Sequence, residues 1–266
     1  MRSSRTLRRA FAAIAALAAL ASLSTAAGAL SGACTASSGP QTTPLVELYT
    51  SEGCDSCPPA DRWLSAQFPK AVSPSRPIAL AFHVDYWDRL GWVDRFASPQ
   101  WTERQYTAVR AHKDAFAYTP QLMLQGHDFA AWRRGNAQAA LDEASRRPAR
   151  ASLELAATQD GNVVRASVTG HVADASLAKT SSIVIAYADS GLVSDVKAGE
   201  NRGVRLTHDH VVRALAKGRE GAQEASASFA RPAEAGNAPT LVAFIQNTTT
   251  NDVLQAVALP LADCTR

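Results

Sequence analysis

The chain has 266 residues, of which 46% are hydrophobic and 19% are charged. These fractions are ordinary for a globular protein, and the length suggests one or two domains. The formal net charge of +3 includes four arginines within the first nine residues, so removing that segment leaves a net charge of −1. The remaining composition gives no reason to expect nucleic-acid binding, which relies on a basic surface.

The first 33 residues have the pattern of a secretory signal peptide. A positively charged start is followed by an apolar run rich in Ala and Leu at residues 10–23, and then by small residues around a cleavage site expected at 29–33. No other stretch approaches the roughly 18 apolar residues of a membrane span. The sequence therefore predicts a periplasmic or secreted protein with no transmembrane span.

Export makes disulfides the expected state of the four cysteines. If Cys54 and Cys57 form one pair, Cys34 and Cys264 remain at the two ends of the mature chain, and chain termini often lie close together. We expect a disulfide between them, which would stabilise by up to about 4–5 kcal/mol because it closes a very long loop. A lipid anchor on Cys34 and two free thiols are the alternatives.

The C-x-x-C motif of Cys54 and Cys57 lies between an expected strand and an expected helix. The apolar run 45–49 predicts a short buried strand, and Pro58 and Pro59 fit the first turn of a helix. Since Pro58 disfavours helical geometry at the residue before it, we place Cys57 near the N-cap. Further elements are expected along this half: a strand at 78–84, a helix at 99–112 capped by Ser98, strands at 121–125 and 129–132, and a helix at 137–146.

The composition changes near residue 151, which predicts two domains, at residues 40–148 and 151–264. Alternating segments on either side of Asp160-Gly161 are typical of a β-hairpin. Further strands are expected at 182–187, 240–246 and 253–259, with one helical patch at 209–216. This pattern predicts a β-sandwich-like second domain.

The order strand, C-x-x-C helix, strand, helix, strand, strand, helix is that of a thioredoxin-like domain. The whole chain resembles a bacterial family of exported thioredoxin-like proteins that has a domain of unknown function. The resemblance implies an α/β thioredoxin-like domain followed by a mostly β, sandwich-like C-terminal domain. It is carried by V-E-L-Y-T-S-E-G-C-D-S-C-P-P-A-D (46–61), A-F-H-V-D-Y-W-D-R-L-G-W (81–92), Y-T-P-Q (118–121) and G-E-N-R-G-V-R-L-T-H-D-H-V-V-R (199–213).

A C-x-x-C motif between a strand and a helix is typical of thiol–disulfide chemistry. By likeness to thioredoxin, Cys54 would attack and Cys57 would resolve the mixed disulfide. A position just before a helix favours a thiolate at Cys54, whereas the nearby charges of Glu52 and Asp55 oppose it. We therefore expect a moderately stabilised thiolate. An inert structural disulfide and a metal site are the alternative interpretations of the motif.

The resemblance implies three further residues at the disulfide. Pro120 is expected to be a cis-proline that lies against the sulfurs, although a trans bond is the commoner state of X-Pro. Thr119 would pair its backbone with a bound peptide. Glu47 interrupts an apolar strand, and by likeness to thioredoxin it would assist proton transfer; the alternative is a carboxylate paired with an arginine.

The loop after the strand at 78–84 carries four candidates for a substrate groove. His83 and Asp85 lie at the C-terminal end of that strand, where α/β sheets place their sites, and Trp87 and Trp92 follow. The alternative is a packed loop, since aromatic runs are more often core than binding surface.

A metal centre is the rival to redox chemistry. Two thiolates, from Cys54 and Cys57, and the imidazole of His83 would suit copper or another soft metal. Elsewhere, His208 and His210 are interpreted as a contact between a strand–helix junction and the first domain.

The sequence therefore predicts an exported thiol–disulfide oxidoreductase that needs no cofactor. Its partner would be a disulfide-bearing protein or a small thiol. The alternative function is a non-enzymatic periplasmic module for copper binding or assembly on the same fold.

Overall fold

The computed structural model describes residues 33–70, 76–114 and 116–264. All of the predicted signal peptide except Ala33 lies outside these ranges. About 40% of the described residues lie in strands and 22% in helices. Within the described ranges, no helix is both long and apolar enough to span a membrane.

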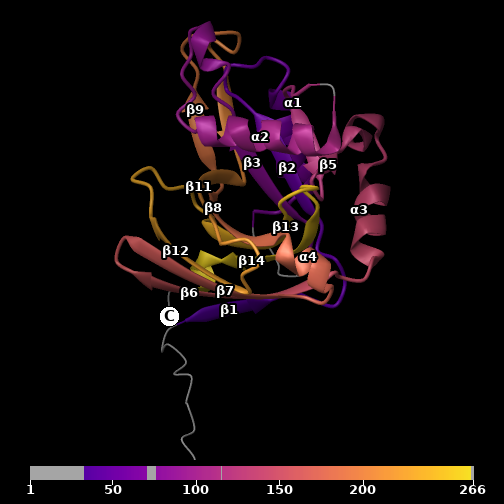
Figure 1. Ribbon diagram of the computed structural model, residues 1–266. Coiled ribbons are helices and arrows are strands. Elements are labelled where there is room, and N and C mark those ends of the chain that lie inside the picture. Colours follow the sequence, from indigo (N-terminus) through magenta and orange to yellow (C-terminus); the bar gives the residue numbers. More distant parts are fainter. Residues whose placement is uncertain (1–32, 71–75, 115, 265–266) are drawn as a thin grey trace, which may run out of the picture.

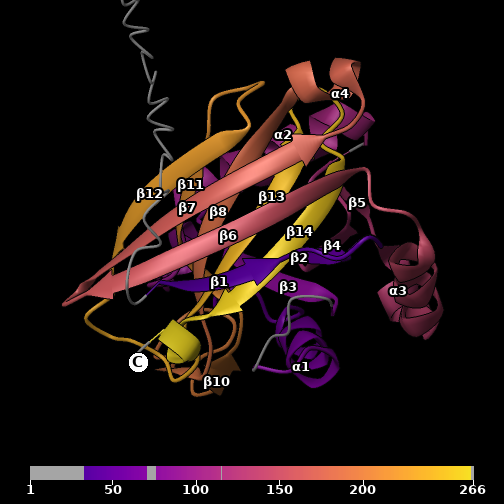
Figure 2. The same cartoon turned by 90° about the horizontal axis from the view of Figure 1, so that it is seen from below.

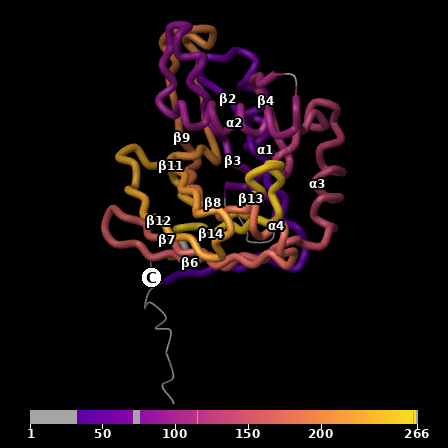
Figure 3. Tube along the Cα trace, in the orientation of Figure 1, coloured from indigo at the N-terminus to yellow at the C-terminus, as the bar shows by residue number. Residues whose placement is uncertain are grey.

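The strands form two principal sheets and a separate hairpin (Figures 1 and 3). In chain order the strands and α-helices are β1 (Cys34–Ser37), β2 (Leu45–Thr50), α1 (Pro58–Gln67), β3 (Ile78–His83), α2 (Pro99–His112), β4 (Gln121–Leu124), β5 (His127–Asp128), α3 (Ala137–Arg146), β6 (Ala151–Asp160), β7 (Val163–Val172), α4 (Ala175–Lys179), β8 (Ser181–Asp189), β9 (Leu192–Asp195), β10 (Arg205–His208), β11 (Val211–Lys217), β12 (Glu224–Ala230), β13 (Thr240–Asn247) and β14 (Val253–Pro260).

The larger sheet has eight strands in the order β14-β13-β8-β11-β3-β2-β4-β5, so it takes strands from both halves of the chain. The two halves meet where β11 runs parallel to β3, with Val211 beside Ala81. The Ala81 amide donates a hydrogen bond of 2.8 Å to the carbonyl of His210. Because β3 and β8 are buried along their whole lengths, both edges of each strand need hydrogen-bond partners. Their interior positions in one continuous sheet supply these partners.

This arrangement corrects the predicted fold class. An α/β thioredoxin-like domain followed by a sandwich-like β domain is wrong, because the described residues are mostly β, with four α-helices and large multi-stranded sheets. The helix expected at 209–216 is the strand β11, which pairs with β8 and β3. The strand expected at 129–132 lies in a 3₁₀ turn, Ala130–Arg134. Long-range pairing has overridden local pattern at β11.

The smaller sheet, β1-β6-β7-β12, packs against the part of the large sheet formed by β8, β13 and β14 (Figure 2). Alternate residues of β6 are buried, as expected for a strand with one face on a core. Its Leu153 and Leu155 share an apolar cluster with Ile185 and Leu241. The hairpin expected around Asp160-Gly161 is confirmed as β6 and β7.

Helices α1, α2 and α3 cover the other end of the large sheet. Leu64 of α1 and Leu141 of α3 pack on one face of β2 and β3, and Trp101 of α2 packs on the opposite face. The expected cap of α2 is confirmed, since the Ser98 side chain accepts a hydrogen bond from the Gln100 amide. Helix α1 begins at Pro58 directly after the C-x-x-C turn, which places this turn at the carboxyl ends of β2 and β3.

The predicted disulfide between Cys34 and Cys264 is confirmed, with Cα atoms 5.1 Å apart. Strand β1 pairs with β6, so that Cys34 lies opposite Ala157, and this pairing brings the beginning of the described chain to its end (Figure 2). In this arrangement Cys34 has no thiol left for a lipid anchor.

Replacing Cys34 and Cys264 together by alanine is expected to lower the free energy of unfolding by about 4 kcal/mol, because the crosslink restricts the unfolded chain over 230 residues. Chemical denaturation without reductant measures the loss. The matched control is the double alanine variant of Cys54 and Cys57, whose crosslink spans three residues and should contribute less. A larger loss in the control would contradict the loop-entropy argument.

Candidate functional site

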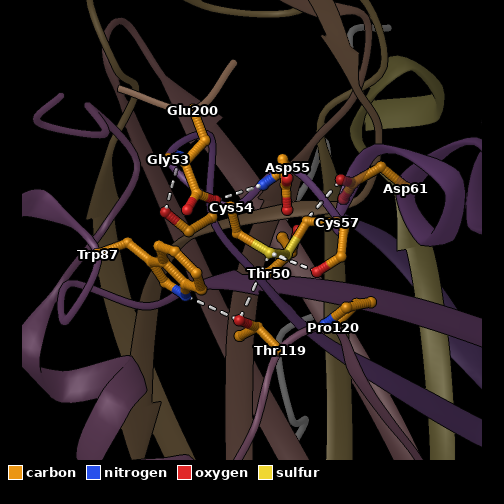
Figure 4. The surroundings of a disulfide bond; sticks show 12 residues. Thr50, Gly53, Cys54, Asp55, Cys57, Asp61, Trp87, Thr119, Pro120 and Glu200 are labelled. Atoms are coloured by element: carbon orange, nitrogen blue, oxygen red, sulfur yellow. Dashed lines mark hydrogen bonds between the residues drawn. A yellow bond between two sulfur atoms is a disulfide. The ribbon is translucent and has the colours of Figure 1, made fainter. Parts of the chain in front are cut away.

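The site is built around the disulfide of Cys54 and Cys57, whose Cα atoms lie 5.4 Å apart (Figure 4). The Cys54 amide donates to the Ser51 carbonyl, and the Cys57 amide donates to the Cys54 carbonyl, each at 3.2 Å. Cys57 is the N-cap of α1 as expected, but its φ of −78° and ψ of −40° are helical despite the following proline. Both cysteines are 0% exposed.

The sulfur of Cys54 has two hydroxyl groups beside it. The Thr119 hydroxyl donates to Cys54 Sγ at 3.6 Å, and Ser56 Oγ lies 3.4 Å from the same sulfur. The indole Nε1 of Trp87 donates to Thr119 Oγ1 at 2.8 Å, which occupies an oxygen lone pair and leaves the Thr119 proton directed to the sulfur (Figure 4). Within the described part of the chain, no side-chain hydrogen bond involves the sulfur of Cys57, so the two sulfurs differ.

The Thr119-Pro120 peptide bond is cis, as predicted. Pro120 is buried and lies beside the disulfide on the same side as Thr119 (Figure 4). Its carbonyl accepts a hydrogen bond of 3.0 Å from Nη2 of Arg133. The prediction that these two residues lie at the disulfide is therefore confirmed in position.

Asp61 is a site residue that the sequence reasoning missed. It lies four residues after Cys57, on the same face of α1, and it is partly buried. Its carboxylate accepts a hydrogen bond of 3.1 Å from Thr50 Oγ1 (Figure 4). Burial raises the pKa of Asp61, although His208 and His83 partly oppose the effect. The spacing of four residues from a helix-capping cysteine is the signal that could have found it.

Glu47 lies on the face of the sheet opposite to α1 and Asp61. Here the alternative interpretation, a carboxylate paired with an arginine, applies. Arg104 of α2 forms a two-pronged ion pair with it, with Nε to Oε2 at 3.0 Å and Nη2 to Oε1 at 2.5 Å. The Tyr49 hydroxyl donates to the same carboxylate at 2.7 Å. The guanidinium of Arg104 also lies against the rings of Phe82 and Phe244. Glu47 is thus a buried ion-pair partner, and its described polar contacts do not include the disulfide.

A buried polar cluster lies behind the C-x-x-C turn, and we define it as Glu52, His83, Asp94 and His208. Nδ1 of His83 is 2.6 Å from Oδ2 of Asp94, and Nε2 of His208 is 3.2 Å from Oε1 of Glu52. The two imidazole rings are 5.0 Å apart. The Glu52 amide donates to Asp94 at 2.8 Å, so the polar cluster is bonded to the main chain of the turn.

The opposite charges within the polar cluster shift the pKa values in opposite directions. Burial lowers the pKa of His83, but the charge of Asp94 and the hydrogen bond to it raise the pKa by more, so the net shift is upward. Burial raises the pKa values of Glu52 and Asp94, but hydrogen bonds from His208, Ser194 and Trp92 to Glu52, and the charge and hydrogen bonds of His83 and two main-chain amides at Asp94, together make the net shift downward. The ionised form of the His83–Asp94 pair is therefore favoured.

The four groove candidates do not share one environment. His83 is buried in the polar cluster, and Nε1 of Trp92 donates to Glu52 at 2.7 Å. Asp85 accepts a hydrogen bond from Thr102 of α2. Trp87 alone of the four contacts the Thr119–Cys54 arrangement. His83 thus belongs to the polar cluster, and Trp92 is bonded to it, so neither side chain is free to line an open groove.

The metal alternative finds no support in the geometry. Among residues 33–70, 76–114 and 116–264, no group of three or more His, Cys, Asp or Glu side chains is placed to hold a metal ion. The three proposed ligands are otherwise engaged, because Cys54 and Cys57 are joined to each other and His83 is bonded to Asp94.

The connection between β9 and β10 supplies further contacts from the second half of the chain. Nδ2 of Asn201 donates to the carbonyls of Glu52 and Cys54, each at 2.9 Å. The Asp55 amide donates to Oε2 of Glu200 at 3.1 Å (Figure 4). The predicted contact of the His208 region with the first half is confirmed, but it comes from a strand and a turn rather than a strand–helix junction.

Comparisons with known proteins give a family and a fold. A family model described as "Protein of unknown function (DUF1223)" matches residues 45–246. An Agrobacterium tumefaciens protein, solved by X-ray crystallography as a structural-genomics target, is similar with a TM-score of 0.59 and 25% identity, over 84% of this chain and 96% of that one. HBP35 of Porphyromonas gingivalis shares the fold, with a TM-score of 0.56 and 15% identity, over 84% and 76% of the two chains. A comparison with curated proteins finds no match.

Replacing Glu47 by glutamine is expected to lower the free energy of unfolding by about 3 kcal/mol, because it leaves the buried Arg104 cation without its counter-charge. The rate at which dithiothreitol reduces the Cys54–Cys57 disulfide, and the pH dependence of that rate, should stay as in the wild type. A changed pH dependence would show that Glu47 takes part in proton transfer after all.

The polar cluster should stabilise the fold most between about pH 4.5 and 6.5. The carboxylates have pKa values below their ordinary 3.8 and 4.5, so their contribution is lost as the pH falls through these lowered values. The pKa of His83 lies above its ordinary 6.5, so its contribution is lost as the pH rises through the raised value. Urea unfolding of wild type and Asp94→Asn measures this, and the difference between them should peak in that window. A difference that does not vary with pH contradicts the assignment.

Proposed function

The chain belongs to the DUF1223 family of proteins of unknown function, and from the geometry of its site we propose that it is a thiol–disulfide oxidoreductase. The observation that carries the proposal is the difference between the two sulfurs. Cys54 Sγ has the Thr119 and Ser56 hydroxyls beside it, which is an environment suited to a thiolate, whereas Cys57 is the N-cap of α1.

Cys54 is the attacking residue in this proposal. In the reduced protein, its thiolate would accept the Thr119 proton as a hydrogen bond, and hydrogen bonds to a charged acceptor are stronger than those between neutral groups. The adjacent N-terminus of α1 adds a favourable partial positive charge. Trp87 supports the arrangement because it fixes the orientation of the Thr119 hydroxyl.

The exchange would proceed in two balanced steps. The Cys54 thiolate attacks one sulfur of a partner disulfide, a mixed disulfide forms, and the other partner sulfur leaves as a thiolate. Cys57 then loses its proton and attacks Cys54 Sγ, which forms the Cys54–Cys57 disulfide and releases the second partner thiolate. Two electrons pass to the partner, and the same steps in reverse would oxidise a partner dithiol.

Asp61 is the proton acceptor that we assign to Cys57. It lies one helical turn from Cys57 on the same face of α1, and burial raises its pKa. A carboxylate with a raised pKa is a better base than an ordinary one when a thiol must be deprotonated. Asp61 thereby takes the role that the sequence comparison with thioredoxin had suggested for Glu47.

The burial of both sulfurs sets a condition on the partner. Attack at either sulfur requires a local opening of the turn or of the side chains over it, and such openings are a normal part of native-state dynamics. The partner is a disulfide-bearing protein or a small disulfide that can use this opening. Two disulfides among four cysteines support an oxidising location, the periplasm or the extracellular space.

The test uses the full mature chain. Cys57→Ser is expected to accumulate a mixed disulfide with glutathione at Cys54, because the resolving thiol is gone, and Cys54→Ser is expected to form none. Mass spectrometry after incubation with oxidised glutathione measures both. The control is the Cys34→Ala/Cys264→Ala variant, which should exchange at the wild-type rate. If the wild-type disulfide does not equilibrate with glutathione, the protein is not an oxidoreductase.

A further inference from the structure

Two main-chain carbonyls of the C-x-x-C turn accept hydrogen bonds from one side chain, and the Cys54 carbonyl also accepts one from the Cys57 amide. Buried carbonyls need hydrogen-bond donors. The side-chain nitrogen Nδ2 of Asn201 donates to the carbonyls of Glu52 and Cys54 at 2.9 Å each. These carbonyls lie on the two sides of Gly53, so Asn201 holds the part of the turn that carries Cys54.

Asn201 is itself held firmly. It is 5% exposed and lies in the connection between β9 and β10, which pair from Asp195 and Arg205 onwards. The Val204 amide donates to the Asn201 carbonyl at 3.0 Å, and the Gly203 amide donates to the Val196 carbonyl at 2.9 Å. The donor therefore reaches the turn from a closed hairpin, and its position does not depend on the disulfide.

We propose that Asn201 is a positioning residue for the thiol–disulfide reaction, supplied to the turn by a distant part of the chain. The inference rests on the proposed function and adds a residue that acts through the main chain of the turn. Asn201 contacts the carbonyl of Cys54 rather than its sulfur, so it does not take part in the chemistry. It keeps Cys54 at the same distance from Cys57 when the covalent bond between them is broken.

The proposed role of Asn201 predicts the direction in which its loss shifts the redox equilibrium of the disulfide. A turn that is held in place in the dithiol state raises the effective concentration of Cys57 at Cys54, and proximity of this kind favours ring closure. Removing the two hydrogen bonds lets the reduced turn spread, so the disulfide becomes less stable relative to the dithiol. The midpoint potential should then rise, and the resolution of a mixed disulfide at Cys54 should slow.

The test compares Asn201→Leu with Asn247→Leu. Asn247 is also buried, at 3% exposure, and its side chain bonds to the Thr180 hydroxyl and the amides of Thr249 and Thr250, away from the C-x-x-C turn. Each variant replaces a buried side-chain amide with an apolar side chain of similar size, so each loses the hydrogen bonds that the amide made. Glutathione redox titration gives the equilibrium constant of the Cys54–Cys57 disulfide, stopped-flow mixing gives the rate of resolution, and thermal unfolding gives the stability of each variant.

Asn201→Leu is expected to weaken the disulfide about tenfold, which corresponds to a rise of about 30 mV, and to slow resolution by a similar factor. Asn247→Leu should lower the unfolding temperature but leave both redox quantities unchanged. If Asn201→Leu does not fold, Asn201→Ser keeps one donor and should give a smaller shift in the same direction.

Three results overturn the inference, and they are distinguishable. If the wild type equilibrates with glutathione but the Asn201 variants keep its equilibrium constant and rate, Asn201 is only structural and the proposed function stands. If the wild type does not exchange at all, both the function and the role of Asn201 fail. Equal redox shifts in the Asn201 and Asn247 variants also overturn it, because they would reflect general loosening of the fold.

Discussion

The parallel pairing of β3 with β11 is the contact on which the rest of the molecule depends. It joins strands from the two halves of the chain into one eight-stranded sheet. Because β11 follows β10 directly, the same pairing brings His208 and the β9–β10 connection against the C-x-x-C turn. The turn is therefore enclosed by residues that lie far from it in the sequence, and its environment exists only in the complete sheet.

The polar cluster makes the enclosure of the turn depend on the pairing of buried ionisable side chains. Its four ionisable side chains are buried, and burying charge is unfavourable unless each charge meets a partner. His83 and Asp94 come from the first half, whereas His208 from the second half meets Glu52. Removing one member leaves its partner without that polar contact beside the turn. The cluster thus links the folding of the sheet to the geometry of the disulfide.

The two cysteines of the site have different surroundings. Hydroxyl groups and Trp87 act on the sulfur of Cys54, and Asn201 acts on its carbonyl. Asp61 lies on the side of Cys57. An inert disulfide needs none of these distinctions, since a structural crosslink works equally well with two equivalent sulfurs. The difference in environment is the reason that we favour exchange chemistry over a structural crosslink.

The sequence by itself determined the local features: the strand before the motif, the helix that begins at Pro58 and both cysteine pairs. Each depends on neighbouring residues, on proline geometry or on the small number of cysteines. Tertiary structure decided the rest. Arg104 reaches Glu47 from 57 residues away, and Asn201 reaches Glu52 from 149 residues away. The segment at β11 became a strand because two neighbouring strands had edges to pair. Such contacts leave no periodic trace in the chain, because they depend on which strands become neighbours in the sheet.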